Sequence, residues 1–221
     1  MKAMILAAGR GERMRPLTDN IPKPLLKVAN KSLIEHHIEN LKAAGFTELV
    51  INTAWLSEKI HQQLGDGSQY GVSIEYSDEV EALETGGGIK KALPLLGDSF
   101  LVVNGDVWCD YDYSQLPALA ENMLAHLVMV SNPEHNPDGD FSIINNLLSN
   151  KKQDCLTFSG IGLYRAAVFN QKEQRFPLAP LLRKSADDNK ISAEFFPGNW
   201  LDIGTPERLE QLNRQLDAAD I

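Results

Sequence analysis

The chain has 221 residues, of which 43% are hydrophobic and 23% charged, and its net charge is −9. This length suits one large domain or two small ones, and we expect a single domain over residues 1–221. The acidic balance argues against nucleic acid or an anionic membrane as a general partner. No stretch reaches the roughly 18 apolar residues of a membrane span. We expect a cytoplasmic protein with a first strand, not a signal peptide, at residues 2–7.

Cysteines and histidines do not indicate a metal site or a reactive thiol. Cys109 and Cys155 form no CxxC pair, and we expect two unpaired thiols in a reducing compartment. His36 and His37 are adjacent and would point about 100° apart on a helix. The sequence therefore predicts ordinary structural roles for these side chains.

Strands and helices alternate through the first half of the chain. Ser32-Leu33-Ile34-Glu35 has the pattern of a helix capping box, and Gly45 is a helix-ending residue. We expect further helices at residues 57–64 and 88–96, and strands at 2–7, 48–52, 72–76 and 100–103. This alternation predicts an α/β fold with a mostly parallel, Rossmann-like sheet flanked by helices.

The second half is less regular. We expect strands at residues 125–131 and 157–165, a loop at 132–140 and a helix at 178–185. One or two strands should lie within residues 191–203. Thr205-Pro206-Glu207 then has the residue order that opens a helix. We find no repeat or linker, so we expect this half to build onto the same sheet.

Positive charge gathers in the segment that follows the first strand. Residues 10–31 hold six basic residues and two acidic ones, which gives +4 and leaves −13 on the rest of the chain. A basic island in an acidic protein indicates a specific anionic ligand. The alternative is a solvated basic surface.

Glycines in this segment indicate a loop that binds phosphate. Gly9-Arg10-Gly11 follows a strand, where glycine lets backbone N–H groups approach an anion. The third glycine of a dinucleotide fingerprint is replaced by Met14, and the P-loop pattern is absent. Arg13 and Arg15 could each bind phosphate oxygens through a guanidinium fork.

Lys23 lies between Pro22 and Pro24, which restrict the backbone on both sides. A lysine held in this way suits a phosphoryl centre whose charge grows in the transition state. A rigid turn without a chemical role is the alternative. Together with the glycines and arginines, the lysine favours a functional loop.

The stretch L-A-A-G-x-G-x-R-x-x-P-L-T, followed by P-K-P-L, resembles the signature of the sugar-1-phosphate nucleotidyltransferases. The resemblance implies a GT-A-like fold and an enzyme that joins a nucleoside triphosphate to a sugar 1-phosphate, releasing pyrophosphate. It also implies roles for individual residues. Nucleotide binding falls to Gly9, Gly11, Glu12, Arg13, Lys23 and Gly86, and Lys23 and Arg15 act in catalysis. Glu84 stands where the family often has glycine, so the motif does not decide which nucleobase is bound.

Two aspartates follow apolar strands far apart in the sequence. Asp106 lies just after the strand at 100–103, at the sheet edge where α/β proteins bind ligands, and Asp202 precedes the last helix. Each could simply end a loop or precede a cap. Both also resemble the family's metal positions, and two carboxylates with a triphosphate suit Mg²⁺.

The resemblance further implies that Asn104 and Asp140 bind an amino-sugar 1-phosphate, with Gly160 and Glu194 as lesser candidates. A carboxylate on that sugar would need a cation, for which Arg183 is a candidate. Within the family, the chain most resembles the members that transfer UMP from UTP in peptidoglycan recycling. The stretches that carry this resemblance are LETGGGI, VNGDVW, LTFSGI and WLDIGTPERL.

We therefore expect an in-line displacement at the α-phosphate of UTP, with Mg²⁺ as cofactor and no protein nucleophile. UTP and an amino-sugar 1-phosphate are the expected partners. Thymidylyl, guanylyl or cytidylyl transfer is one alternative, and a non-catalytic nucleotide-sensing module is another. The sequence leaves the oligomeric state open, with a monomer as the default.

Overall fold

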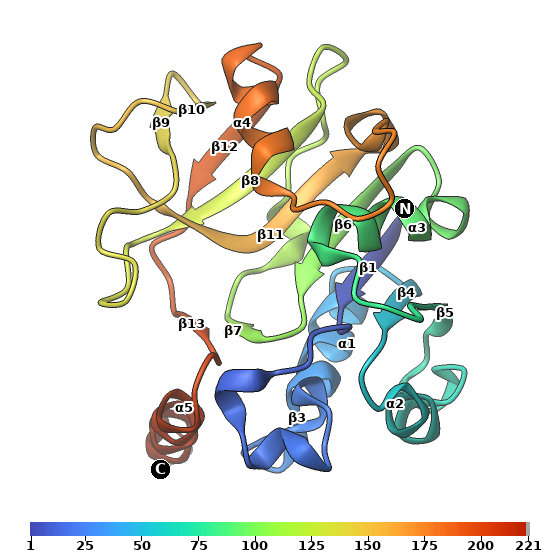
Figure 1. Cartoon of the computed structure of the whole chain (residues 1–221). Helices are drawn as coiled ribbons and strands as arrows, with labels where there is room; N and C mark the ends of the chain where they lie inside the picture. Colours follow the sequence, from blue (N-terminus) through green and yellow to red (C-terminus); the bar gives the residue numbers. More distant parts are fainter. Residues whose placement is uncertain (220–221) are drawn as a thin grey trace.

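The computed structural model describes residues 1–219 and contains a nine-stranded sheet (Figure 1). Across the sheet the strands are β5 (Ser73–Asp78), β4 (Glu48–Thr53), β1 (Lys2–Leu6), β6 (Ser99–Asn104), β11 (Thr157–Arg165), β8 (Ala125–Val130), β12 (Ile191–Phe195), β10 (Leu147–Ser149) and β9 (Ser142–Ile144). Only β11 and β10 run against the others among these strands. The expected mostly parallel α/β sheet is confirmed.

Helices cover both faces of this sheet. Helices α1 (Leu33–Ala43) and α2 (Ser57–Leu64) pack on one face, and α3 (Glu84–Leu96) and α4 (Ala179–Asp187) pack on the other. Side chains of β1 alternate between the two cores, since Ala3 and Ile5 join the first and Met4 joins the second. Burial on both faces explains why the strand reads as a continuous apolar run.

Several short elements surround the sheet. Strand β7 (Val107–Cys109) pairs with β13 (Trp200–Asp202), and β2 (Lys27–Val28) pairs with β3 (Lys31–Ser32). Short 3₁₀ helices lie at Glu12–Met14, Leu17–Asp19, Lys23–Leu25, Ser68–Tyr70, Tyr113–Gln115 and Ala166–Phe169. The β7–β13 pair brings together segments about 90 residues apart in the sequence.

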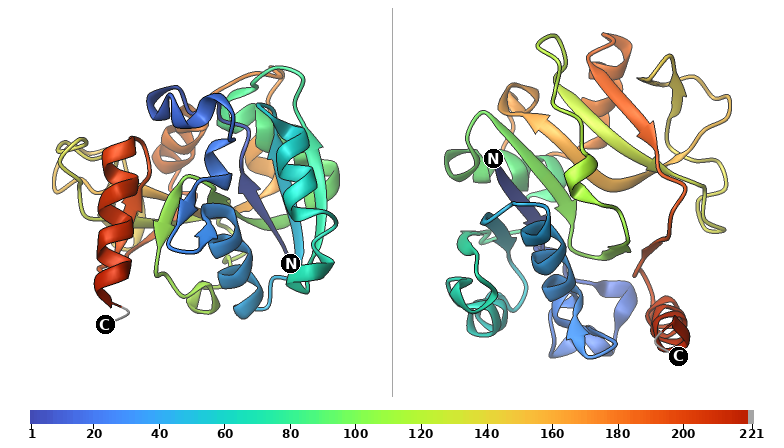
Figure 2. Two further views of the ribbon diagram at one scale, coloured as in Figure 1. Left: turned by 90° about the horizontal axis from the view of Figure 1, so that it is seen from below. Right: turned by 180° about the vertical axis from the view of Figure 1, so that it is seen from behind.

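The last helix, α5 (Pro206–Ala219), packs against the loop that follows β1 (Figure 2). A third core joins them, made by Met14, Leu26, Val28, Leu33, Ile203 and Leu212. The Asn213 carboxamide also accepts a hydrogen bond from the Ala29 backbone N–H at 2.7 Å. The C-terminal helix thus supports the glycine-rich loop.

Most predicted elements are confirmed, and α2 and β11 have the predicted bounds. The capping box at Ser32 and Glu35 is present. The helix expected at 88–96 instead begins at Glu84, so three glycines lie inside it. Gly86 and Gly87 lie against residues 174–176, where a Cβ would clash. Tertiary packing therefore overrides the low helix propensity of glycine. None of the helices within residues 1–219 is long and apolar enough to cross a membrane.

His37, on α1, gives the stability of the fold a pH dependence. Burial lowers the pKa of His37 from 6.5 to about 4. Between these values the unfolded chain binds a proton that the folded chain does not. The free energy of unfolding should therefore fall as the pH drops from 6.5 towards 4, by about 3 kcal/mol for this group.

The variant His37→Gln should lose that part of the pH dependence. Urea unfolding at pH 7 and pH 4.5 would show a smaller difference in the free energy of unfolding than the wild type shows. An equal difference in both proteins would contradict the expectation.

Candidate active site

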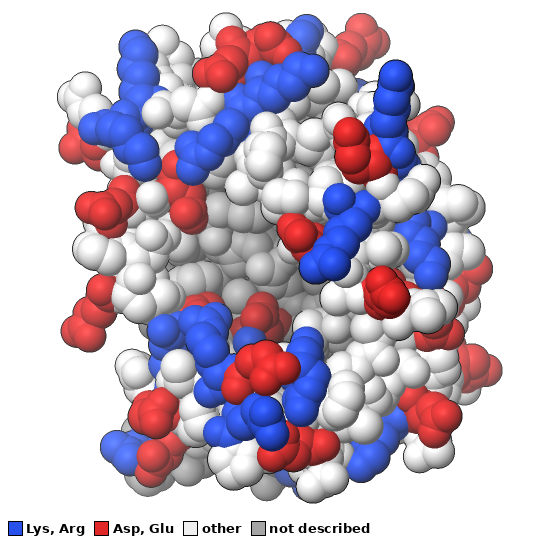
Figure 3. Space-filling model, viewed as in Figure 1, with Lys and Arg blue, Asp and Glu red and all other residues white. Residues whose placement is uncertain are grey.

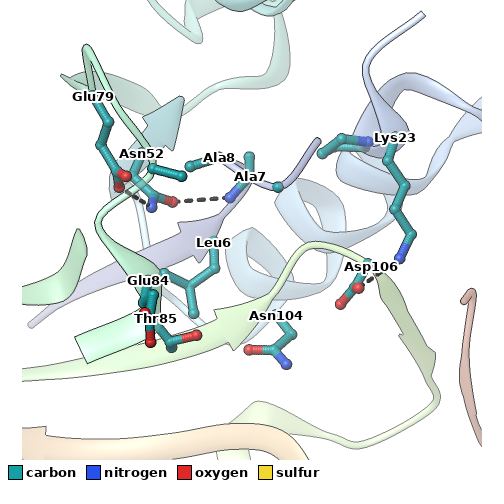
Figure 4. Close-up of a pocket in the computed structure, with 13 residues that line it drawn as sticks. Leu6, Ala7, Ala8, Lys23, Asn52, Glu79, Glu84, Thr85, Asn104 and Asp106 are labelled. Atoms are coloured by element: carbon teal, nitrogen blue, oxygen red, sulfur yellow. Dashed lines mark hydrogen bonds and ion pairs between the residues drawn. The ribbon is translucent and has the colours of Figure 1, made fainter. Parts of the chain in front are cut away.

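A cavity of about 240 Å³ lies at the carboxyl ends of β1, β4 and β6 (Figure 4). Ligands bind at this edge in open α/β sheets. A second cavity of about 230 Å³ adjoins it and shares Gly9, Lys23 and Asp106. Of the predicted residues, the first cavity also contains Asn104, and the second also contains Gly11, Glu12 and Arg13. The fold therefore brings most of the predicted site together.

Gly11 determines the shape of the glycine-rich loop. Its φ is +70°, and a Cβ there would lie 3.0 Å from the Thr18 methyl group and 3.3 Å from Cβ of Lys23. The Thr18 hydroxyl donates to the Gly11 carbonyl at 2.8 Å. Glycine is required both for the left-handed backbone and for this close approach. The folded-back loop carries Lys23 to the place where the two cavities meet.

Lys23 and Asp106 form an ion pair, with Nζ 2.6 Å from Oδ2. The Lys23 side chain is 9% exposed, whereas the Asp106 side chain is 42% exposed. The prolines on either side of Lys23 fix the short helix Lys23–Leu25 that carries it. A buried ammonium facing a more open carboxylate provides a fixed positive charge beside a position that a metal ion can reach.

Two residues of this cavity were not predicted from the sequence. Asn52, at the end of β4, accepts from the Ala7 N–H at 2.9 Å and donates to Glu79 at 2.7 Å (Figure 4). Glu79 also accepts from the Leu83 N–H at 2.9 Å. Both side chains are buried. This network joins the start of the glycine-rich loop to the start of α3. The only signal in the sequence is an asparagine that ends an apolar strand.

Asp106 and Asp202 become neighbours through the β7–β13 pair. Asp202 lies opposite Val107, and the Ile203 N–H donates to the Asp106 carbonyl at 2.7 Å. Arg208 donates to Oδ2 of Asp202. Oδ1 of Asp202 is buried without a hydrogen-bond partner among residues 1–219. His135 Nε2 lies 3.0 Å from Oδ1, but not in hydrogen-bond geometry.

Asp202 has a buried carboxylate oxygen that makes no hydrogen bond, and the backbone pairing places Asp202 near Asp106, so the two residues could together hold a divalent cation. Within residues 1–219 no group of three or more His, Cys, Asp or Glu side chains could hold a metal. A metal here would therefore take two carboxylates from the protein and further oxygens from substrate phosphates and water. That ligand set is typical of Mg²⁺.

Four predicted residues lie outside the lining of both cavities: Asp202, whose contacts are given above, and Arg15, Gly86 and Asp140. The Arg15 side chain is 57% exposed and pairs with Asp19, with Nε 2.8 Å from Oδ1. Gly86 is buried against Phe176, next to the lining residue Thr85. Asp140 accepts from the Phe158 N–H at 2.9 Å. Their proposed roles stay predictions.

Comparison with known proteins identifies the family. Residues 2–146 match the family model described as nucleotidyl transferase, so the chain belongs to that family. It is 54% identical to the N-acetylmuramate alpha-1-phosphate uridylyltransferase of Neisseria meningitidis serogroup B, over 96% of each chain. It is 34% identical to the enzyme of that name from Caulobacter vibrioides, over 93% of this chain and 92% of that one.

Other relatives are named for other sugar phosphates. A mannose-1-phosphate guanyltransferase of Gibberella zeae is 33% identical over 94% of this chain and 62% of its own length. A putative glucose-1-phosphate thymidylyltransferase from Bacillus anthracis, solved with sucrose, superposes with a TM-score of 0.85. That structure is 24% identical and covers 100% of this chain and 96% of its own. It confirms the nucleotidyltransferase fold.

The Asn52 network should be necessary for a rigid site. Asn52→Ala would remove the carboxamide that binds both the Ala7 N–H and the Glu79 carboxylate, and would leave both buried groups without that hydrogen bond. We expect the free energy of unfolding to fall by about 2–3 kcal/mol and nucleoside triphosphate binding to weaken. Urea unfolding and titration calorimetry would measure the two effects. Asn30→Ala, on the exposed turn between β2 and β3, is the matched control and should change neither. Unchanged stability in Asn52→Ala would contradict the expectation.

Proposed function

We propose that this protein transfers UMP from UTP to N-acetylmuramic acid α-1-phosphate, giving UDP-N-acetylmuramic acid and pyrophosphate, in peptidoglycan recycling. The observation that carries the reaction type is the Lys23–Asp106 pair at the junction of two adjoining cavities. The substrates are supported by the near full-length similarity to the Neisseria uridylyltransferase.

The chemistry is an in-line displacement in which positioning and charge carry the rate. An oxygen of the sugar 1-phosphate attacks the α-phosphorus of UTP, and the bond to the pyrophosphate oxygen breaks. Lys23 offsets the charge that grows at the α-phosphate. Backbone N–H groups at Gly9 and Gly11 face the triphosphate, and Arg13 steadies the leaving pyrophosphate. Arg15 would support it after leaving Asp19.

Asp106 and Asp202 would hold Mg²⁺. When bound, the ion would supply positive charge that offsets the repulsion between the attacking sugar phosphate and the triphosphate. Asn104 and Asp140 would orient the amino sugar. Thr85, which lines the 240 Å³ cavity, would contact the base together with the adjoining Gly86.

No protein nucleophile is needed in this proposal. Burial raises the pKa of the Cys109 thiol to about 12, so it stays protonated at neutral pH. Cys109 and Cys155 are both free thiols, which supports a reducing, cytoplasmic location. We propose a monomer as the active form.

Pyrophosphate release by the purified protein tests the proposed function. UTP, dTTP, CTP and GTP would each be combined with the 1-phosphates of N-acetylmuramate, N-acetylglucosamine, glucose and mannose, with and without EDTA. We expect release with UTP and the muramate phosphate, abolished by EDTA and restored by excess Mg²⁺. Pyrophosphate release with another pair alone would rule out the proposed substrates. Release with no pair, despite nucleotide binding, would favour a nucleotide-sensing module.

Lys23→Met should lower kcat by at least about a hundredfold and change the thermal midpoint little. The half-open Asp106 carboxylate can be solvated by water once its partner is removed, so the fold should tolerate the loss. Lys27→Met, in the exposed part of the neighbouring strand β2, is the matched control and should keep wild-type kcat. Parallel losses of activity and thermal midpoint in Lys23→Met would contradict a catalytic role.

A further inference from the structure

Arg183, on α4, carries a positive charge without a negative partner. Its guanidinium carbon lies 4.7 Å from the centre of the buried Phe141 ring. Its Nη1 donates to the Asn150 carboxamide oxygen at 3.3 Å and to the Asp140 carbonyl at 3.5 Å. Among residues 1–219, no carboxylate lies within 4.0 Å of it, and its Nε and Nη2 donate to no acceptor. One edge of a fixed guanidinium is therefore available to a ligand.

Most other arginines of the chain are satisfied within the protein. Carboxylate partners are present for Arg10, Arg15, Arg175, Arg208 and Arg214. Arg165 donates to three backbone carbonyls. In the part of the chain that the structure describes, only Arg13 and Arg183 have neither arrangement. Arg13 lines the cavity proposed for the triphosphate. Like Arg13, Arg183 therefore has a guanidinium that could bind an anionic ligand.

Arg183 is linked through Asp140 and β11 to Asn104, the residue proposed to bind the sugar. A Cβ on Gly160 would lie 2.6 Å from the Asn104 side chain, so β11 crosses directly beside that residue. Two residues earlier on the chain, the Phe158 N–H binds the Asp140 carboxylate. The Asp140 carbonyl then contacts Arg183. Contacts therefore run from Asn104 along β11 to Arg183.

The surface agrees with this arrangement. Figure 3 shows a hollow in this face of the molecule, with Lys and Arg side chains below it, over the loop after β1, and above it, over α4. Asp and Glu side chains also border the hollow, and a substrate lying in it would meet Lys and Arg side chains at both ends. Its phosphates would face the loop, and a second anionic group would face α4.

We infer that Arg183 binds a carboxylate carried by the acceptor sugar and so determines which amino sugar the enzyme uses. The inference rests on the proposed function. N-acetylmuramate differs from N-acetylglucosamine by a lactyl ether that ends in a carboxylate. The free edge of a guanidinium matches a carboxylate with two parallel hydrogen bonds. Stacking on Phe141 keeps that edge oriented.

The test compares two acceptors that share the phosphate, the ring and the N-acetyl group. kcat/KM for UMP transfer would be measured with N-acetylmuramate 1-phosphate and N-acetylglucosamine 1-phosphate in the wild type, Arg183→Met and Lys184→Met. Lys184 is the next residue of α4, is exposed and makes no ion pair within residues 1–219, so it is the matched control. Arg183→Met should lower the muramate-to-glucosamine ratio about ten- to a hundredfold. Lys184→Met should leave it unchanged.

A neutral acceptor separates the effect of the carboxylate charge from the effect of the substituent's shape. The lactyl amide of N-acetylmuramate 1-phosphate keeps the shape of the substituent and removes its ionisation. The wild type should prefer the acid to the amide, and Arg183→Met should use both equally. A variant that is only misfolded would lose activity with every acceptor and keep the preference.

The outcomes separate this inference from the proposed function. If the wild type uses the muramate phosphate but Arg183→Met keeps both preferences, or loses all acceptors alike, the role of Arg183 is overturned and the proposed function stands. If the wild type does not use the muramate phosphate, both are overturned. A selective loss in Arg183→Met supports the assignment.

Discussion

The ammonium of Lys23 and the carboxylate of Asp106 lie 2.6 Å apart, and the parts of the site are arranged around this contact. Lys23 comes from the loop after β1, and Asp106 comes from the turn between β6 and β7. Each charge is taken partly out of water, so each needs an opposite charge nearby, either that of the other side chain or that of a ligand. Phosphate and a divalent cation can replace the two partners in one event. The ion pair thus holds the loop near the sheet edge, in the form to which we propose that a metal-bound nucleotide binds.

A lysine on a long loop can keep this position only if the loop is held from outside. Gly11 folds the loop back, and the third core fixes its far side against α5. Asn52 fixes its first residues to β4. The helix that supports the loop also supplies Arg208, which holds Asp202 beside Asp106. Residues from both ends of the described chain therefore complete a site whose centre lies at the end of β6.

Local pattern was enough to predict the sheet, because strands buried on both faces are continuously apolar and helices carry an apolar stripe. Local pattern also singled out Lys23, because prolines flank it, and Asp106, because it follows a buried strand. Contacts distant in sequence were not predictable in the same way. The β7–β13 pair, the start of α3 under Phe176 and the Asn52–Glu79 bond each depend on a partner far along the chain. Arg15 follows a motif, but its guanidinium is directed by Asp19 four residues later.

The positions of the two unpaired arginines suggest how one fold accommodates different sugars. Arg13 lines the cavity beside the glycine-rich loop, where the proposed ligand is the triphosphate, a group that does not depend on the sugar. Arg183 lies on α4, next to Asp140, where we propose that it meets a substituent of the sugar. Mannose, the sugar in the name of the related guanyltransferase, carries no acidic substituent. Separating the reaction centre from the substituent site lets selectivity change through α4 while the chemistry at β1 and β6 stays in place.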